Sequence, residues 1–257
     1  MVTATAQGQL WGARADDWAA VQEWVLRPAY DAILDAVLDE LGSWTGMALL
    51  DVGCGAGRFG SLAAARGARV AGIDAAPELI EIAERRLTSG AFRVGDMAQL
   101  PYADGSFAVV SGINSFQYAV DPAAAMAEAT RVVRPGGALV AAVWGPVDEC
   151  ESAAYVAVLG HKPAWPYALS GHGVLEDLVR GAGLNAAEAA RVTCPWAYRD
   201  EQTALRGLLS TGPAVRAIGQ SGEDHVRTAV LDAIAPYRRD DGSYLLRNVV
   251  RYLVARV

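Results

Sequence analysis

The chain has 257 residues, of which 53% are hydrophobic and 20% are charged, a mixture typical of a folded globular protein. Its 29 acidic and 22 basic side chains give a net charge of −7. Because a polyanion would be repelled, we expect no nucleic-acid partner.

The three cysteines, Cys54, Cys150 and Cys194, lie far apart and form no C-x-x-C pair. They predict neither a zinc site nor a disulfide framework, and they favour a reduced, cytoplasmic compartment. No run of about 18 apolar residues predicts a membrane span. Residues 1–8 lack the basic and apolar regions of a signal peptide, so we expect no export signal.

The N-terminal part of the chain is predicted to be helical. Apolar side chains recur at helical spacing across residues 10–40. We expect Pro28 to break this region into two helices and Gly42 to end the second. Residues 1–45 would then form a helical lid over a binding site, or else pack as core.

From residue 46 onward, strand and helix patterns alternate. Strands apolar on both faces predict a parallel sheet covered by helices on both sides. The predicted strands cover residues 47–50, 69–73, 92–94, 107–113 and 138–144. The predicted helices between them cover residues 58–66, 77–87 and 122–133.

The rhythm changes after residue 144, where we expect two cap insertions, near residues 146–173 and 200–235. A further helix and strand are expected from their patterns, together with a turn between two extended runs. These elements are a helix over 174–181, a strand over 186–193, the turn at 241–242 and the second extended run over 244–257.

A glycine-rich loop follows the first predicted strand. Residues 51–57 read DVGCGAG, with Gly53, Gly55 and Gly57 at alternate positions. Glycines let the backbone approach a ligand closely, and the helix N-terminus behind them offers free N–H groups. Residues 55–60 also satisfy the G-x-G-x-x-G pattern of nicotinamide enzymes, so the loop alone does not identify the cofactor.

The residues after the next two strands separate the alternatives. Asp74 ends the second strand, where a carboxylate can accept both hydroxyls of a ribose. Asp96 and Met97 follow the third strand and suit the amino group and the ring of adenine. Lys162 is the single lysine and has no Tyr four residues before it, which argues against a short-chain dehydrogenase.

Residues 47–144 resemble class I S-adenosylmethionine-dependent methyltransferases of the small-molecule type, a group similar to the ubiquinone and menaquinone methyltransferases. The resemblance implies an α/β fold with a Rossmann-like, doubly wound, seven-stranded, mostly parallel sheet whose last strand is antiparallel. It also implies S-adenosylmethionine as cofactor and a methyltransferase domain over residues 46–257. The motifs that carry it are LDVGCGAG at 50–57, GID at 72–74, GDM at 95–97, LPYADGSF at 100–107 and RVVRPGG at 131–137.

The resemblance also names candidate cofactor contacts. Those it implies directly are Asp51, Gly53, Gly55, Asp74, Asp96 and Met97. Neighbouring residues that we add to the candidate set are Cys54, Gly57, Ala75 and Asn114. For Gly57 the alternative is helix–strand packing, and for Asp51 it is a cap on the turn.

Candidate acceptor-site residues follow the fourth strand, because ligands bind beyond the carboxyl ends of strands in such sheets. Asn114 and Gln117 are predicted to orient an acceptor, while Phe116 and Tyr118 would either wall the pocket or lie in the core. His161 and His172 are candidate general bases, with surface positions as the alternative. The aromatic loop at 165–167 and the tryptophans of the lid are further candidates for the pocket wall. The lid tryptophans are Trp11, Trp18 and Trp24.

The predicted function is methyl transfer from S-adenosylmethionine to a small molecule in bacterial specialised metabolism. Motifs typical of adenine, glutamine or cytosine methylation are absent, and the scattered acids predict no metal site. No membrane partner is expected, and a homodimer is a candidate assembly. The open alternatives are a methyltransferase-fold cyclase or decarboxylase, a nicotinamide oxidoreductase, and a cofactor-binding interaction protein without a pocket.

Overall fold

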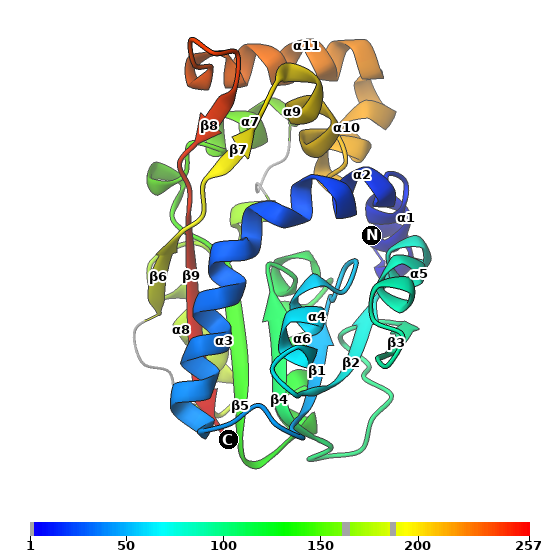
Figure 1. The fold of residues 1–257 in the computed structure, drawn as a ribbon, viewed down its shortest axis with the longest axis vertical. Coiled ribbons are helices and arrows are strands. Elements are labelled where there is room, and N and C mark those ends of the chain that lie inside the picture. Colours follow the sequence, from blue (N-terminus) through cyan, green and yellow to red (C-terminus); the bar gives the residue numbers. More distant parts are fainter. Residues whose placement is uncertain (1–2, 161–164, 186–188) are drawn as a thin grey trace.

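The computed structural model describes residues 3–160, 165–185 and 189–257. A seven-stranded sheet of order β3-β2-β1-β4-β5-β9-β6 runs through these parts of the chain (Figure 1). Its strands are β1 Ala48–Val52, β2 Arg69–Asp74, β3 Ala91–Val94, β4 Phe107–Ile113, β5 Val133–Trp144, β6 Ala190–Thr193 and β9 Val249–Arg256. The β1–β5 strands pair in parallel, and β9 is antiparallel to both of its neighbours. The predicted fold class is therefore confirmed.

Helices cover both faces of this sheet, as the two-sided apolar strands require. One core cluster joins α3 (Arg27–Leu41) and α4 (Arg58–Ala64) to one face of the sheet. A second joins α6 (Pro122–Val132) and α8 (Val174–Gly181) to the opposite face. The helix α5 (Pro77–Arg86) follows β2. The strand order reverses between β1 and β4, and in such sheets this switch point opens a crevice at the carboxyl ends of the strands.

The N-terminal region differs from its prediction. It forms α1 (Ala4–Gly12), α2 (Ala15–Ala20) and the short 3-10 helix η1 (Gln22–Leu26) before α3 begins. Pro28 is the second residue of α3 and breaks nothing, because the first turn of a helix needs no N–H from that position. Gly42 ends α3 in the left-handed conformation with φ 79°, as predicted.

The segment near 200–235, predicted to be a cap insertion, consists of α9 (Glu201–Leu208), α10 (Gly212–Ser221) and α11 (Glu223–Ile234). Figure 1 shows these helices at the top of the molecule, with α1 and α2 beneath them. The smaller sheet of β7 (Trp196–Tyr198) and β8 (Tyr244–Leu246) adjoins them, so the predicted run 244–257 is divided into two strands. The remaining short helices are η2 Phe116–Tyr118, η3 Val147–Glu149, α7 Ala153–Val158, η4 Trp165–Tyr167 and η5 Ala235–Tyr237.

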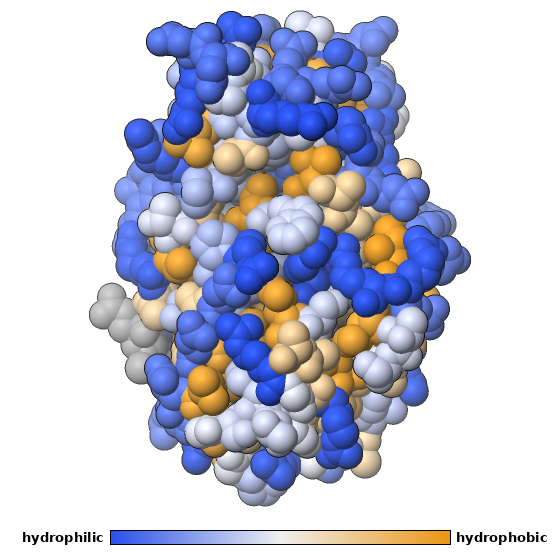
Figure 2. All heavy atoms as spheres, in the orientation of Figure 1, coloured by the Kyte–Doolittle hydropathy of each residue, from blue (hydrophilic) through white to orange (hydrophobic). Residues whose placement is uncertain are grey.

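The face seen in Figure 2 mixes hydrophilic and hydrophobic residues, and hydrophilic ones prevail over the helices at its top. None of the helices in the described ranges is both long and apolar enough to cross a bilayer. The predicted helix over 122–133 ends at Val132, and β5 begins at once, five residues earlier than the apolar run suggested. This early part of β5 is largely exposed, which explains why its polar sequence did not indicate a strand.

Candidate active site

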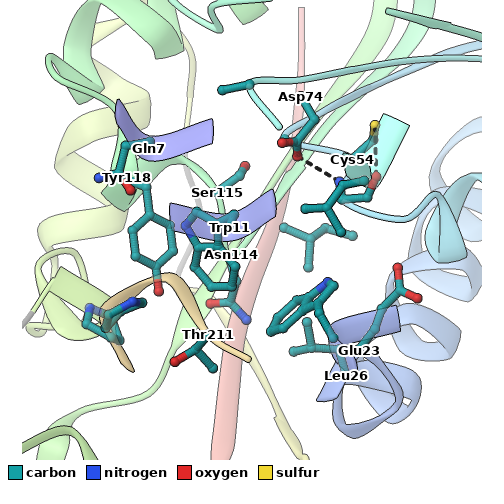
Figure 3. A pocket seen from close by; sticks show the side chains of 18 of the residues that line it. Gln7, Trp11, Glu23, Leu26, Cys54, Asp74, Asn114, Ser115, Tyr118 and Thr211 are labelled. Atoms are coloured by element: carbon teal, nitrogen blue, oxygen red, sulfur yellow. Dashed lines mark hydrogen bonds between the residues drawn. The ribbon is translucent and has the colours of Figure 1, made fainter. Parts of the chain in front are cut away.

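A pocket lies at the carboxyl ends of the parallel strands. It encloses about 1340 Å³ of space free of atoms, part of it open to solvent. Its wall combines strand ends, the N-terminal helices and the cap. Figure 3 shows Asp74 and Cys54 at one end of the pocket, Thr211 and the Tyr118 hydroxyl at the other, and the Asn114 amide between them.

The glycine turn after β1 is attached to the end of β2. Oδ2 of Asp74 accepts from the N–H of Gly55 at 2.8 Å, and Oδ1 accepts from the N–H of Ala76 at 2.9 Å. A Cβ built at Gly55, where φ is 53°, would stand in the pocket, 3.6 Å from Nε1 of Trp18. The turn thus leaves an open space beside a carboxylate that still has free lone pairs.

Gly57 serves a different purpose from the glycines beside it. It does not line the pocket, and a Cβ there would lie 2.9 Å from Cβ of Ala83 in α5. Its φ of 76° also requires a residue that tolerates the left-handed region. The structure therefore places Gly57 at the packing of α4 against α5, whereas the alternative considered from the sequence was the packing of a helix on a strand.

Asp51 lies behind the turn and does not face the pocket. Its side chain is buried, and Oδ1 accepts from Oγ of Ser111 at 2.7 Å. The pKa of Asp51 is raised to about 7. Burial is the main cause, the hydrogen bond from Ser111 opposes it, and the charges of Asp74 and Glu23 add to it. Any influence of Asp51 on a ligand is indirect, through the backbone of the turn.

The loop after β3 brings Asp96 and Met97 to the pocket wall, next to Ala75 from the end of β2. Oδ1 of Asp96 accepts from the N–H of Ala98 at 2.9 Å, and Cε of Met97 lies 3.6 Å from the point where a Cβ of Gly53 would be. A flat ring placed here would meet a carboxylate edge and a thioether face, as the sequence suggested for adenine.

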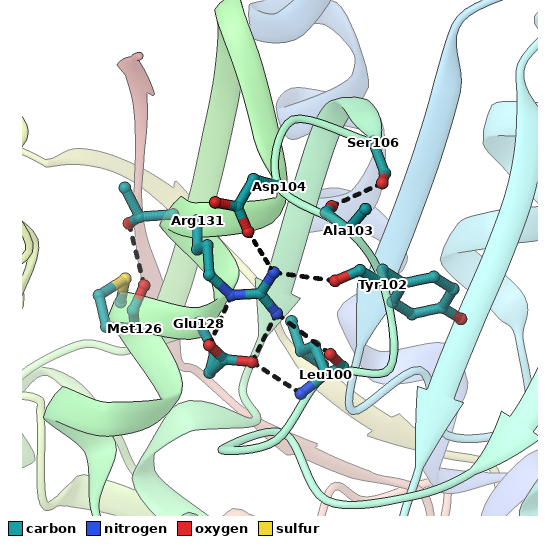
Figure 4. Close-up of polar contacts among 9 residues, drawn as sticks. Leu100, Tyr102, Ala103, Asp104, Ser106, Met126, Glu128 and Arg131 are labelled. Carbon is teal, nitrogen blue, oxygen red and sulfur yellow. Dashed lines mark hydrogen bonds and ion pairs between the residues drawn. The ribbon is translucent and has the colours of Figure 1, made fainter.

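Arg131 of α6 fastens this loop to the body of the protein (Figure 4). Its guanidinium donates to the backbone oxygens of Tyr102 at 2.8 Å and Leu100 at 3.1 Å. It also forms ion pairs with Asp104 and Glu128, both at 2.7 Å. Glu128 in turn accepts from the N–H of Leu100 at 2.9 Å, so one side chain pair fixes the chain between β3 and β4.

Asn114, directly after β4, has the most constrained backbone in the pocket. Its φ of 50° makes it the one non-glycine residue with positive φ in the ranges that the structure describes. Such conformations cost about 1–3 kcal/mol and cluster at functional sites. The amide nitrogen Nδ2 is buried without a hydrogen-bond partner, while Oδ1 accepts from Nε2 of Gln117 at 3.4 Å.

Other residues predicted for the acceptor site lie elsewhere. Gln117 is buried behind Asn114 and does not line the pocket, and Phe116 is fully buried in the core. His172 is exposed and is not part of the pocket wall, so the structure gives it no place beside a reacting group. His161 lies outside the described residues.

The N-terminal region contributes directly to the pocket wall. Trp11 and Trp18 line it, whereas Trp24 is 45% exposed and lies beneath the guanidinium of Arg58 at 3.7 Å. Glu23 is buried and pairs with Arg86 at 2.7 Å and with Arg58 at 3.5 Å. These ion pairs hold η1 against α4 and α5, so the lid segment is attached at the glycine turn.

Comparison with known proteins agrees with this geometry. Residues 50–141 match the family model described as a methyltransferase domain. This stretch of the chain therefore resembles the methyltransferase domain of class I, S-adenosylmethionine-dependent enzymes. The predicted resemblance is thereby confirmed, and with it the predicted cofactor.

Individual relatives align with this chain over regions of different length. A demethylmenaquinone methyltransferase of Beutenbergia cavernae is 36% identical over 121 residues, which are 44% of this chain and 49% of that protein. The uncharacterised protein Mb1440c of Mycobacterium bovis is 27% identical over 230 residues, or 84% and 81% of the two chains. The crystal structure of YcgJ from Bacillus subtilis superposes with a TM-score of 0.60 at 19% identity. The match covers 87% of this chain and 98% of that one. The chain spans 32–59% of the length of the relatives above 30% identity.

Part of the pocket wall consists of aromatic residues that the sequence predicted only in part. We call five residues the aromatic chamber, because they line the pocket and lie near one another. They are Tyr118, Trp144, Tyr155, Tyr167 and Trp196. Tyr118 and the 165–167 loop were candidates, and Trp144 could have been found because it ends β5. Tyr155 and Trp196 carry no local signal.

A pair of glycine variants separates pocket space from backbone strain. Gly55→Ala and Gly57→Ala share the penalty of a positive φ, about 1 kcal/mol, but only the first adds a methyl group inside the pocket. We expect Gly55→Ala to lose S-adenosylmethionine binding with modest destabilisation. Gly57→Ala should lower the free energy of unfolding by a further 1–3 kcal/mol or so, because the added methyl group overpacks the contact with Ala83. Its affinity for S-adenosylmethionine should be retained. Calorimetric titration with urea unfolding tests this, and equal affinities would contradict it.

The raised pKa of Asp51 predicts a pH dependence of stability. The folded carboxyl holds its proton more tightly than the unfolded one, so its contribution to stability falls as pH rises from about 4 to about 7. Asp51→Asn cannot lose this proton. Between pH 4 and 7 the free energy of unfolding of the variant should therefore rise by up to about 4 kcal/mol relative to that of wild type. Urea unfolding from pH 4 to 8 measures it. The exposed Asp35→Asn serves as control, and a profile for Asp51→Asn parallel to wild type would refute the prediction.

Arg131→Ala should loosen the loop that carries Asp96 and Met97. Since two backbone oxygens and two carboxylates lose their donor, we expect a loss of about 2 kcal/mol in unfolding free energy and faster amide exchange over residues 98–106. S-adenosylmethionine should bind more weakly. Arg134→Ala removes a nearby exposed arginine and should change none of these quantities. Unaltered exchange in Arg131→Ala would show that the loop does not depend on the guanidinium.

Proposed function

We propose that the protein transfers the methyl group of S-adenosylmethionine to a small molecule. The observation that carries this proposal is a single pocket that joins Asp74 and the glycine turn at one end to the aromatic chamber at the other. A cofactor with a nucleoside end and a reactive end fits such a pocket, with the reactive end near Asn114. The demethylmenaquinone methyltransferases among the relatives are named for a small-molecule acceptor, which supports a small acceptor here.

The residues present fit the cofactor. Asp74 uses one lone pair on each oxygen for backbone N–H groups, which leaves one on each for ribose hydroxyls. Burial raises the pKa of Asp74, and hydrogen bonds from the backbone N–H groups of Ala76, Gly55 and Ala75 oppose this effect. Beside Gly55, the buried N–H of Trp18 has no partner in the described structure and can donate to the carboxylate of the methionine part.

When bound, S-adenosylmethionine supplies a sulfonium-activated methyl group. The lone pair of the acceptor atom forms the new bond to carbon, the S–CH₃ bond breaks with its electrons remaining on sulfur, and the acceptor loses its proton. The chain contributes by holding both reactants in line, which is worth up to roughly 7–11 kcal/mol in favourable cases. Trp11, Trp18 and Thr211 line the pocket and reduce the space left for water.

A second candidate function is non-methylating use of the same cofactor, as a cyclase or decarboxylase. The pocket wall, as far as it is described, holds no histidine or lysine that could act as a base. The [4+2]-cyclase SpnF shares the fold, with a TM-score of 0.54 and 20% identity. A nicotinamide oxidoreductase stays the weaker alternative. Cytoplasmic location, a role in specialised metabolism and a homodimer remain predictions.

Calorimetric titration with S-adenosylmethionine, S-adenosylhomocysteine and NADPH tests the proposed function first. We expect binding of the two sulfur compounds alone, and about a hundredfold loss in Asp74→Ala, because two hydrogen bonds to a charged group disappear. Mass spectrometry of reactions with a panel of small hydroxylated and carbonyl compounds should then find S-adenosylhomocysteine. Binding of NADPH alone would overturn the proposal, and product formed without S-adenosylhomocysteine would favour the second candidate.

A further inference from the structure

The aromatic chamber is the part of the pocket left for the acceptor once Asp74, Asp96 and the glycine turn are assigned to the cofactor. Trp196 packs edge-on against Trp144, with centroids 5.4 Å apart, and against Tyr155 at 5.9 Å. Tyr118 belongs to η2, and Figure 3 shows its ring extending into the pocket. Flat ring surfaces and edges dominate this wall, so it suits a ligand with rings of its own.

The charges around the pocket have one sign. Glu23, Asp74 and Asp96 line it, and the described part of the wall contains no lysine, arginine or histidine. Glu23 is already paired with two arginines that lie outside the wall. An anionic acceptor would therefore give up its hydration without gaining a cation, which is strongly unfavourable in a buried site.

The hydrogen-bonding groups of the chamber divide into satisfied and free ones. The Tyr155 hydroxyl donates to the backbone oxygen of Leu208 at 2.7 Å, and the hydroxyls of Tyr167 and Ser152 lie 2.7 Å apart. In contrast, Nε1 of Trp196 is buried with no partner among the described residues, as is Nδ2 of Asn114. Both groups can only donate.

Tyr118 adds a third free group. Its ring packs edge-on against Trp11 with centroids 5.1 Å apart, and none of the side chains drawn in Figure 3 forms a hydrogen bond with its hydroxyl. Burial raises the pKa of Tyr118, so the phenol stays protonated and can donate. The chamber thus offers donors to lone pairs on a ligand and offers no charge.

We propose that the acceptor is an uncharged, ring-containing molecule with carbonyl or hydroxyl oxygens, and that the chamber rejects anions of the same shape. This inference rests on the proposed function, since it assigns the other half of the pocket to the cofactor. Trp196, Asn114 and Tyr118 are the residues that bind the acceptor's oxygens.

Two probes of nearly equal shape test the charge preference by calorimetric titration at neutral pH. 2-Acetylnaphthalene carries a neutral carbonyl group, whereas 2-naphthoate carries a carboxylate on the same ring system. Both are titrated into the full chain, with and without saturating S-adenosylhomocysteine. We expect 2-acetylnaphthalene to bind at least tenfold more tightly. A smaller or reversed ratio, or no binding of either probe, would overturn the proposal.

Variants test the donors separately. Trp196→Phe and Tyr118→Phe keep a ring but remove the N–H or O–H, and each should weaken 2-acetylnaphthalene binding about fivefold. Trp24→Phe removes an exposed indole outside the pocket and should leave binding unchanged. Circular dichroism confirms folding of each variant. If neither chamber variant weakens binding, the assignment of the donors is overturned, while the wild-type ratio still decides the charge preference.

The same samples separate this inference from the proposed function. S-adenosylmethionine binding is measured on each protein before the probes are added. Absent cofactor binding with the probe preference intact would overturn the proposed function and leave the neutral, aromatic-binding chamber standing. Cofactor binding with a preference for 2-naphthoate would overturn the neutral chamber and leave the proposed function standing.

Discussion

The carboxylate of Asp74 connects the two turns on which the pocket is built. The parallel register of β1 and β2 sets Val52 opposite Ile73, so the glycine turn begins where β2 ends. Each oxygen of Asp74 then accepts one backbone N–H, from Gly55 in one turn and from Ala76 in the other. A carboxylate that is partly shielded from solvent is costly unless it is bonded, and here the bonds that offset this cost also fix the shape of the site.

A second constraint acts at the end of β4. The left-handed backbone of Asn114 is unfavourable by itself, and neighbouring bonds hold it in place. Its N–H donates to the oxygen of Ala142 at 2.8 Å, and Oγ of Ser115 donates to the oxygen of Val52 at 2.7 Å. Gln117 supports the side chain from behind. The amide of Asn114 therefore stays between the two halves of the pocket, where a flexible residue would turn toward solvent.

Local patterns in the sequence predicted the central sheet and the cofactor half of the pocket. Strand ends followed by DVGCGAG, Asp74 and Asp96 are short-range signals, and the switch point brings them together without further information. The acceptor half depends on long-range packing, because α1 and α2 meet α10 and α9 across nearly the whole chain. Tyr155 and Trp196 become neighbours only through that packing. The candidates Gln117 and His172 were chosen by residue type, and residue type does not determine which way a side chain faces.

One charge distribution accounts for both halves of the pocket. Among the described residues, Asp74 and Asp96 at its wall have no cationic partner, Glu23 is neutralised by two arginines, and burial raises the pKa of Asp51 behind the turn to about 7. At about 4 Å, a single charge contributes roughly 1–4 kcal/mol to the attraction of a cation, depending on local screening. A ligand with a sulfonium charge gains this energy, whereas its neutral thioether product does not. Since the same field repels anions, the acids that favour the charged cofactor over its product also leave the acceptor chamber to uncharged molecules.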